Sequence, residues 1–473
     1  MLVSHETMQR PLAIAPRQGR RWPGSGIVRP LVFPLAFMAV LLSVALVPRA
    51  ARANGAFPES LQLVLPADRP DQIVLATNFG LIISDDGGAT WTWTCEQKAS
   101  VMGSLYSVSA PPLDRFFSMS TLVGLAYSDD DSCTWTASGG SLDTTLASDY
   151  FPDPTNPMRV YAMGSNPDDD TIPPKLFSSD DGGKTFGAAI FTAAMGVSLA
   201  GVENARSDPK TIYLATFASA TGGFHPTLQL SHDGGVSWTP IDVEPSLGPN
   251  NFRIVAVDPN DARVITLRVI EPTGESLAVS RDGGMTFSKV ASLAGQFTAY
   301  VRLDSGTILV AGALAVDGVG FRSTDGGMTF SDWTPHTLGD GGVPEVAADG
   351  GPPRPPHIRA LAARGGKVYA AAKNFSDDWA VGVSTDEGLT FTKLTRYDQV
   401  SSIRPCAQVA CLESCESQAG AQVWPVALCH APPPPPEPKK GCGCAFGDAG
   451  GAGEAVGFLL AALALARARR PRR

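Results

Sequence analysis

Acidic side chains are the residues of this sequence best suited to chemistry. Hydrolysis of a glycosidic bond needs two carboxyl groups flanking that bond, one of them kept protonated by its surroundings. Four acidic residues outside any repeated motif are candidates for such a pair: Asp149, Asp153, Asp340 and Glu345. Acidic side chains are mostly solvated in proteins, so these four residues are more simply interpreted as solvent-exposed charges on loops. We assign no catalytic residue.

The sequence contains no clear metal, cofactor or nucleophile signature. The six histidines show no metal-ligand spacing. No phosphate-binding glycine loop, Ser-His-Asp order or dinucleotide fingerprint stands out in the sequence. We therefore predict no metal and no cofactor, and an enzyme activity is less favoured than a binding role.

The middle of the chain is strongly acidic. The formal net charge is −9, but residues 1–53 carry +6 and residues 439–473 carry +5, which leaves −20 for residues 54–438. Such a body repels phosphate backbones, so nucleic acid is excluded as a partner. Two acidic runs, Asp129–Asp131 and Asp168–Asp170, offer oxygen ligands to calcium, although solvated turns explain them more simply.

One eight-residue pattern, Ser-x-Asp-x-Gly-x-Thr-aromatic, recurs seven times. The copies begin at intervals of 43 to 61 residues, a period typical of one four-stranded propeller blade. Around the fifth copy, Arg253–Val257 and Val264–Val269 alternate like strands and are separated by an Asp-Pro-Asn-Asp turn. We predict an all-β, seven-bladed β-propeller over residues 57–400, without a helix of three or more turns.

The composition of the repeat suits a tight turn between the third and fourth strands of a blade. The aspartate accepts backbone N–H groups, glycine supplies a positive φ, and the Ser and Thr hydroxyls complete the turn. The closing aromatic residue is expected to wedge between neighbouring sheets. The second copy has Ser132 in place of glycine, and we expect its turn to be distorted. The structural aspartates are Asp86, Asp130, Asp181, Asp233, Asp282, Asp325 and Asp386, and the aromatics are Trp91, Trp135, Phe186, Trp238, Phe287, Phe330 and Phe391.

These seven motifs resemble the Asp-box, or BNR, repeat. The resemblance covers residues 57–400 and implies a propeller like those of sialidases, sortilin-type receptors, xyloglucanases and the photosystem II assembly factor. It says little about activity, because the motif stabilises an outer turn away from the usual central site. The Arg-Ile-Pro motif near the start of sialidase catalytic domains is missing. The most similar segment is Phe252–Val255, in a middle blade.

The eight cysteines point to disulfides in an exported chain. Cys95 and Cys133 lie by the first and second repeats, and we predict that they bond to each other and join blades one and two. A second group, in a small module at 401–430, is predicted to bond in one of three pairings, with a short helix around Leu412–Ser414. A zinc site is the alternative for this group, but it lacks a C-x₂-C spacing. Its members are Cys406, Cys411, Cys415 and Cys429.

The N-terminal residues have the order of an export signal. Arg20, Arg21 and Arg29 precede the apolar run Leu31–Val47, and the small residues Ala51–Ala53 follow it. This order predicts a signal peptide over residues 1–53, with the mature chain starting near Asn54. A retained membrane anchor is the alternative, because the apolar run is slightly long.

The C-terminal residues have the order of a surface anchor. A proline-rich linker at 431–440 precedes Gly-Cys-Gly-Cys, the apolar segment Ala455–Ala466 and a final arginine cluster. The tail at 441–473 resembles the myxobacterial C-terminal sorting tail (MYXO-CTERM type). That resemblance implies cleavage by a sorting protease near Cys442 or Cys444 and attachment to the membrane, with the basic end on the cytoplasmic side.

Together these features predict an exported, surface-anchored propeller that binds a protein, a peptide or a glycan without catalysis. An Asp-box glycosidase of the sialidase or xyloglucanase type is the first alternative, and two inward-facing carboxylates in a central cleft would favour it. An assembly factor for envelope complexes is the second alternative.

Overall fold

The computed structural model describes residues 58–95, 105–120, 124–166, 169, 171–314, 318–339, 341–345 and 354–432, all in the unit formed by residues 57–473. The predicted signal peptide, most of the proline-rich linker, and Cys442 and Cys444 in the predicted sorting tail lie outside the described residues. No helix among the described residues is long and apolar enough to span a membrane.

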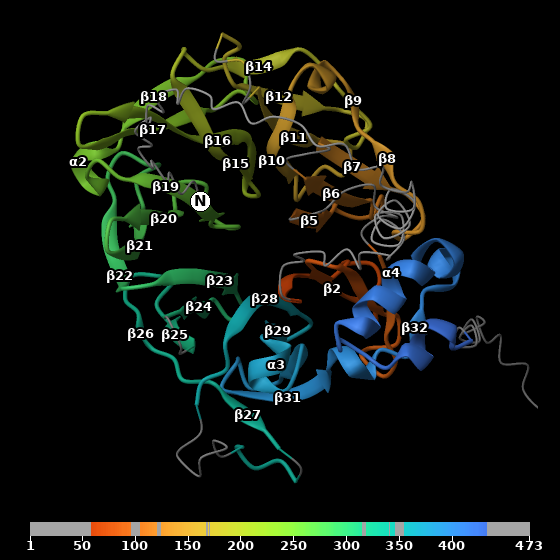
Figure 1. Ribbon diagram of the computed structural model, residues 1–473. Coiled ribbons are helices and arrows are strands. Elements are labelled where there is room, and N and C mark those ends of the chain that lie inside the picture. Colours follow the sequence, from red (N-terminus) through yellow and green to blue (C-terminus); the bar gives the residue numbers. More distant parts are fainter. Residues whose placement is uncertain are drawn as a thin grey trace, which may run out of the picture. The chain divides into compact units, whose positions relative to one another are not determined.

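Seven sheets, each with four antiparallel strands paired in chain order, are arranged around a common centre (Figure 1). Blades 1 to 3 contain β1 (Ser60–Val64), β2 (Ile73–Thr77), β3 (Gly80–Ser84) and β4 (Thr92–Thr94); β5 (Leu105–Val108), β6 (Phe116–Ser120), β7 (Gly124–Ser128) and β8 (Thr136–Ala137); and β10 (Leu146–Pro152), β11 (Val160–Ser165), β12 (Lys175–Ser179) and β14 (Ala189–Thr192).

Blades 4 to 7 continue in the same order. They contain β15 (Val197–Ala205), β16 (Asp208–Ala220), β17 (Gly223–Ser231) and β18 (Thr239–Asp242); β19 (Asn251–Val257), β20 (Ile265–Glu271), β21 (Gly274–Ser280) and β22 (Ser288–Leu293); β23 (Gln296–Arg302), β24 (Ile308–Ala313), β25 (Gly318–Ser323) and β26 (Ser331–Asp332); and β28 (Ile358–Arg364), β29 (Lys367–Ala372), β30 (Val381–Ser384) and β31 (Thr390–Thr395). The chain is a seven-bladed β-propeller, as its repeats predicted.

The hydrophobic core lies between the blades. Apolar clusters contain residues of two consecutive sheets, and one such cluster occupies each of the seven blade–blade contacts, including that between blade 7 and blade 1. Strands of a sheet that packs against apolar neighbours on both faces are expected to be unbroken runs of apolar residues. Strands β2 and β3 have this form, since every residue of each is buried. Each blade is therefore stabilised by both of its neighbours.

Seven equivalent turns, here called the repeat turns, join the third and fourth strands of the blades. In the first, the Ser84 hydroxyl donates to Asp86 Oδ1 at 2.8 Å and accepts the N–H of Gly88 at 2.8 Å. Asp86 also accepts the N–H and hydroxyl of Thr90, at 2.9 and 2.6 Å. The same set of bonds recurs around Asp130, Asp181, Asp233, Asp282, Asp325 and Asp386.

The second repeat turn keeps these bonds, so the predicted distortion is wrong. The N–H of Ser132 donates to Ser128 Oγ at 3.0 Å, and Thr134 bonds to Asp130 through both its N–H and its hydroxyl. The cost appears in the backbone, because Asp131 and Ser132 have φ values of 61° and 69°, which glycine adopts more readily.

The closing aromatics of several repeat turns pack between sheets. Trp238 donates its indole N–H to the carbonyl oxygen of Ile190 in blade 3 at 2.9 Å. Trp135 packs against a cluster shared by blades 1 and 2, and Phe391 lies in the cluster of blades 6 and 7. The turns therefore join neighbouring blades as well as strands within a blade.

Short parallel strands connect successive blades at the outer edge. β9 (Gly139–Gly140) pairs with β13 (Thr185–Phe186) in blade 3, and β27 (His336–Leu338) pairs with β31 in blade 7. After blade 7, β32 (Ser402–Ile403) pairs in parallel with β4 of blade 1. The segment after blade 7 therefore pairs with blade 1 in the same way as the segment after blade 6 pairs with blade 7. This pairing closes the ring.

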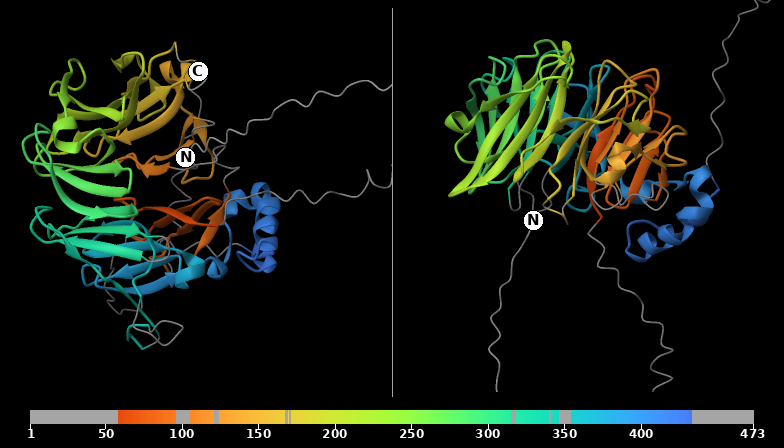
Figure 2. Two further views of the ribbon diagram at one scale, coloured as in Figure 1. Left: turned by 60° about the vertical axis from the view of Figure 1, so that its left-hand side comes forward. Right: turned by 90° about the horizontal axis from the view of Figure 1, so that it is seen from above.

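The module after blade 7 contains α4 (Gln408–Gly420) and the short helices η4 (Pro405–Ala407) and η5 (Val426–His430). It lies beside blade 1 in both views of Figure 2. Its Trp424 ring is 5.0 Å from that of Trp93 and 5.7 Å from that of Phe79, so the module extends the apolar cluster between blades 7 and 1.

The disulfides differ from the sequence prediction. Cys95 bonds to Cys411 and Cys133 bonds to Cys406, so the predicted Cys95–Cys133 bridge is wrong. Cys415 bonds to Cys429 within the module, but Cys406 and Cys411 bond to cysteines of the ring, so none of the three predicted pairings among the four module cysteines forms. Because all four are in disulfides, they form no zinc site. The helix predicted around Leu412–Ser414 is present as part of α4 and buries Cys411 and Cys415. The cysteines of the ring pair with the module because β32 brings the module onto blade 1.

A network of charged groups lies where blade 1 meets blade 7 and the module, a contact that we call the seam. The buried Arg404 of the module forms ion pairs with Asp85 and Asp131, in the first and second repeat turns. Arg69, between β1 and β2, pairs with Asp131 at 2.7 Å. From blade 7, Arg364 donates to the carbonyl oxygens of Pro66, Arg69 and Gln72 at 2.9 to 3.1 Å. Blades 7, 1 and 2 and the module are thereby held together.

Replacing Ser132 by glycine is expected to stabilise the protein by about 1 kcal/mol, because the backbone strain of a positive φ is relieved. The control is Ser141→Gly, in a 3-10 helix of the same region, which should destabilise. Urea unfolding of the two variants measures both effects. A Ser132→Gly variant less stable than the parent would show that the turn is not strained.

The double variant Cys133→Ala/Cys406→Ala is expected to lose about 2–5 kcal/mol of unfolding free energy. With Cys95–Cys411 intact, this bridge closes a loop through residues 95–133 and 406–411 of the unfolded chain. Cys415→Ala/Cys429→Ala is the matched control and should lose less, since its cysteines are only 14 residues apart. Denaturant unfolding measures both losses. Mass spectrometry of unreduced peptides should find Cys95 linked to Cys411, and a Cys95–Cys133 peptide would contradict the fold at this seam.

Candidate ligand site on the inner strands

The first strand of every blade lines the middle of the ring (Figure 1). Six of these inner strands carry a β-bulge, which changes the direction of nearby side chains. The bulged strands are β1, β10, β15, β19, β23 and β28. Asp149 directly follows the bulge of β10, and Gly201 occupies the same place in β15 of the next blade.

Asp149 and Glu203 are neighbouring carboxylates on the inner strands of blades 3 and 4. Asp149 accepts the N–H of Tyr150 at 2.9 Å, and its Oδ2 lies 3.7 Å from where a side chain on Gly201 would begin. Glu203 accepts the N–H of Val257 in blade 5 at 3.1 Å. Both side chains are half-buried. Asp149 therefore lies against Gly201 of blade 4.

Burial makes these two carboxyl groups easier to protonate. Burial raises the pKa of Asp149 to about 6, although the nearby charge of Arg253 acts in the opposite direction. Burial also raises the pKa of Glu203 to about 7, and the negative charge of Asp149 adds to this shift. Near neutral pH, Glu203 is therefore partly protonated while Asp149 is mostly charged.

Two arginines and a tyrosine line a pocket of about 200 Å³ between the inner strands of blades 5 and 6. Arg253 donates to the carbonyl oxygen of Phe252 at 3.1 Å, and Arg268 donates to that of Phe297 at 3.2 Å. Burial and the charge of Arg268 lower the pKa of Arg253. Tyr300 completes the polar wall. We call Asp149, Glu203, Arg253, Arg268 and Tyr300 the inner-strand site.

The other acidic candidates from the sequence lie elsewhere. Asp153 is buried in the turn after β10, where it accepts the N–H groups of Thr155 and Asn156 and the amide of Asn204. Glu345 forms an ion pair with Lys393 at 2.8 Å. Asp340 lies outside the described residues. Of the four candidates, Asp149 is the one described on an inner strand.

The described residues of the acidic runs make ordinary contacts. Asp129 pairs with Arg115 at 2.6 Å, and Asp131 pairs with Arg69 and Arg404. Asp169 accepts the N–H and hydroxyl of Thr171, while Asp168 and Asp170 lie outside the described residues. Asp129 and Asp131 are thus already neutralised by arginine.

The aspartates of the repeat turns are held as structural anions. The hydroxyl and N–H of Ser237 lower the pKa of Asp233 to about 2, and those of Thr286 lower the pKa of Asp282 to about 2. A carboxylate with so low a pKa cannot serve as a general acid near neutral pH.

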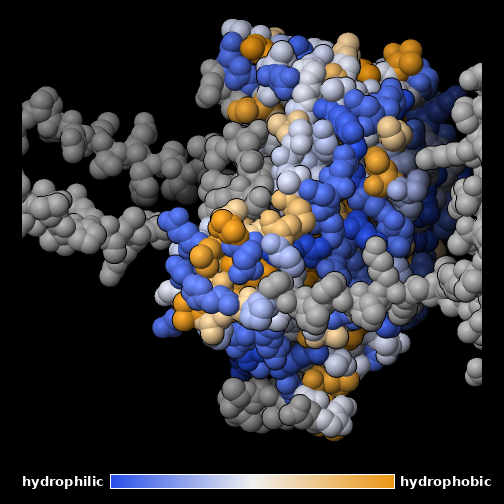
Figure 3. Space-filling view, turned by 90° about the vertical axis from the view of Figure 1, so that its right-hand side faces the viewer, coloured by the Kyte–Doolittle hydropathy of each residue, from blue (hydrophilic) through white to orange (hydrophobic). Residues whose placement is uncertain are grey.

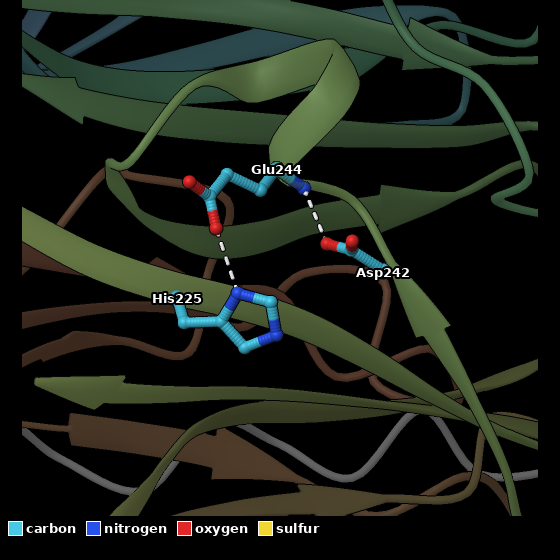
Figure 4. A group of neighbouring side chains, drawn as sticks. All are labelled: His225, Asp242 and Glu244. Carbon is cyan, nitrogen blue, oxygen red and sulfur yellow. Dashed lines mark hydrogen bonds and ion pairs between the residues drawn. The ribbon is translucent and has the colours of Figure 1, made fainter. Parts of the chain in front are cut away.

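A histidine and two carboxylates meet on the surface of blade 4 (Figure 4). His225 on β17 bonds through Nδ1 to Glu244 Oε2 at 2.7 Å, and this hydrogen bond raises the pKa of His225. The N–H of Glu244 donates to Asp242 Oδ1 at 3.0 Å. Sequence reasoning missed this group, because pairing of β17 with β18 brings together residues that lie 17 to 19 positions apart.

No protein-family model matches the chain, and no curated protein matches it. Comparison with solved structures finds proteins of low sequence identity. An ancestral GH74 enzyme has 15% sequence identity and a TM-score of 0.48, covering 72% of this chain and 47% of its own. YCF48 from Cyanidioschyzon merolae has 14% identity and a TM-score of 0.45, covering 68% and 94%. The β-propeller domain of the Trilobed protease from Pyrococcus furiosus has 10% identity and a TM-score of 0.44, covering 72% and 99%.

These identities relate to fold alone. The chain covers about half the length of the ancestral GH74 enzyme. The class that the structure defines is a seven-bladed β-propeller with a disulfide-bonded C-terminal module.

The raised pKa of Glu203 predicts a specific dependence of stability on pH. The folded protein holds the proton of Glu203 more tightly than the unfolded chain does. The contribution of this proton to the unfolding free energy is therefore complete below the ordinary pKa of 4.5 and is lost as the pH rises through about 7. Glu203→Gln keeps an acceptor for Val257 and removes the titration. Its unfolding free energy should therefore fall less than that of the parent as the pH is raised through this range.

The matched control is Glu413→Gln, at an exposed position on α4, which should leave the slope unchanged. Urea unfolding at a series of pH values measures all three proteins. Equal slopes for the parent and Glu203→Gln would show that folding does not raise the pKa of Glu203.

Proposed function

We propose that the protein is an exported, surface-anchored propeller that binds a glycan or peptide ligand at the inner-strand site without cleaving it. The observation that carries the proposal is the pocket of about 200 Å³ lined by Arg253, Arg268 and Tyr300 beside two half-buried carboxylates. Pockets for drug-sized ligands begin at about 300 Å³. This pocket therefore suits one sugar ring or one amino acid side chain of a longer ligand.

The lining of the pocket favours binding over hydrolysis. Hydrolysis of a glycosidic bond needs carboxyl groups on both sides of the bond. The described residues that line the pocket include no carboxylate, because Asp149 and Glu203 belong to blades 3 and 4. Arginine and tyrosine side chains donate hydrogen bonds to hydroxyl, carbonyl and carboxylate oxygens of a ligand.

Export and anchoring rest on separate support. Six cysteines form three disulfides, which persist in oxidising compartments. The resemblance of the seven turns to Asp-box repeats and of the last residues to the myxobacterial sorting tail fits a protein held outside the cell. Under this proposal the module and the proline-rich linker at 431–440 hold the ring away from the membrane.

One observation favours glycoside hydrolysis as a second candidate function. Glu203 has a pKa of about 7 and lies close to the more acidic Asp149, a combination that general acid catalysis uses. A substrate reaching from the pocket towards blades 3 and 4 would meet both groups. Release of reducing sugar from xyloglucan or of sialic acid from sialyllactose, abolished by Glu203→Gln, would establish this function in place of the first.

The binding proposal is tested with glycan and peptide arrays probed with the purified full chain. Any ligand found is then titrated against Arg253→Ala, which should weaken binding at least about tenfold by removing a charged hydrogen-bond donor. The matched control is Arg263→Ala, at an exposed position on the turn after β19, which should bind as the parent does. Ligands that bind both variants equally would place the binding site elsewhere, and ligands that are cleaved would overturn the non-catalytic role.

A further inference from the structure

Blade 4 carries an extension that other parts of the ring lack among the described residues. Its hairpin of β16 and β17 is the longest of the described hairpins, and the short helix α2 (Glu244–Leu247) follows β18. The N–H of Phe224 donates to the carbonyl oxygen of Pro249 at 3.0 Å, and that of Val243 donates to the carbonyl oxygen of Pro226 at 3.4 Å. The loop carrying α2 is therefore tied to β17 at two points.

These ties fix the positions of three potential metal ligands. His225 lies on β17 directly before Pro226, Asp242 ends β18, and Glu244 begins α2. One ligand atom from each lies within 4.8 Å of the other two. Bonds of about 2.0–2.2 Å would place the ligands of a zinc ion roughly 3.4 Å apart. Binding one ion would therefore need side-chain rotations that bring the three ligand atoms closer together than 4.8 Å.

We propose that His225, Asp242 and Glu244 form a binding site for a divalent transition metal ion such as Zn²⁺ on the surface of blade 4. Asp242 uses Oδ1 to accept the N–H of Glu244, which leaves Oδ2 for the ion. Glu244 now approaches the imidazole through Oε2, and an ion between these two groups would take the place of the shared proton (Figure 4).

The ligand types select the class of metal. One imidazole with two carboxylates suits zinc, nickel or copper, whereas calcium and magnesium prefer oxygen ligands alone. Two carboxylates and a neutral imidazole also give the site a charge that balances a divalent ion. Three protein ligands leave at least one coordination position for water or for a group of another molecule.

The test is calorimetric titration of the purified full chain with zinc chloride. His225→Ala should bind one zinc ion fewer than the parent, and Glu244→Gln should weaken that site at least about tenfold, since it keeps the shape but loses the charged ligand. Cys442 and Cys444 are present in every variant, so zinc held by these thiols cancels in the comparison.

The matched control is His232→Ala, an exposed histidine of the same blade that bonds to Thr211 and should leave zinc binding unchanged. Electron paramagnetic resonance of bound Cu²⁺ should show one imidazole nitrogen in the parent and none in His225→Ala. Equal zinc stoichiometry in the parent and His225→Ala would overturn the proposal, as would equal losses in His225→Ala and His232→Ala. Binding of calcium with the same affinity at this site would overturn the choice of metal.

Discussion

Closure of the ring is the constraint on which the rest of this structure depends. The apolar clusters lie between sheets, so each blade is half of two cores and has no complete core of its own. An open ring would expose one face of blade 1 and one face of blade 7, and burial of apolar surface is the main driving force of folding. The tryptophans Trp93 and Trp424 at this seam show how much apolar area depends on its closure.

The seam is held by several kinds of interaction at once. β32 adds a parallel strand to blade 1, Arg364 of blade 7 donates to three carbonyl oxygens of blade 1, and Arg404 joins two repeat turns to the module. Two disulfides then link the module covalently to Cys95 and Cys133. Apolar side chains gather among hydrophilic ones on the outer side of the molecule (Figure 3). In the module, Val409 and Val426 are exposed.

The inner-strand site is a product of the same closed arrangement. Glu203 is positioned by the backbone of blade 5, Asp149 rests over Gly201 of blade 4, and Arg268 bonds to the backbone of blade 6. None of these contacts is local in sequence.

The sequence nevertheless predicted the blade count, the strands and the turn chemistry, because the repeat pattern is local and recurs at a regular period. Asp149 was among its candidates, but Glu203 and Arg253 were missed. Nothing in the sequence shows that Glu203 bonds to the backbone of blade 5 or that Arg253 lines a pocket with residues of blade 6. The cysteine pairing failed for a related reason: it depends on where the chain goes after blade 7.

Native-state hydrogen exchange of the seam amides tests ring closure most directly. The amides of Ser401 and Arg404 donate to the carbonyl oxygens of Trp91 and Trp93, at 2.8 and 2.7 Å, and thus report on the contact between the module and blade 1. If closure stabilises the whole ring, these two amides should exchange only with global unfolding, at the same free energy as the buried central strands β11 and β20. Exchange of the seam amides at a much lower free energy, while β11 and β20 stay protected, would show that the ring is stable when open and would contradict this account.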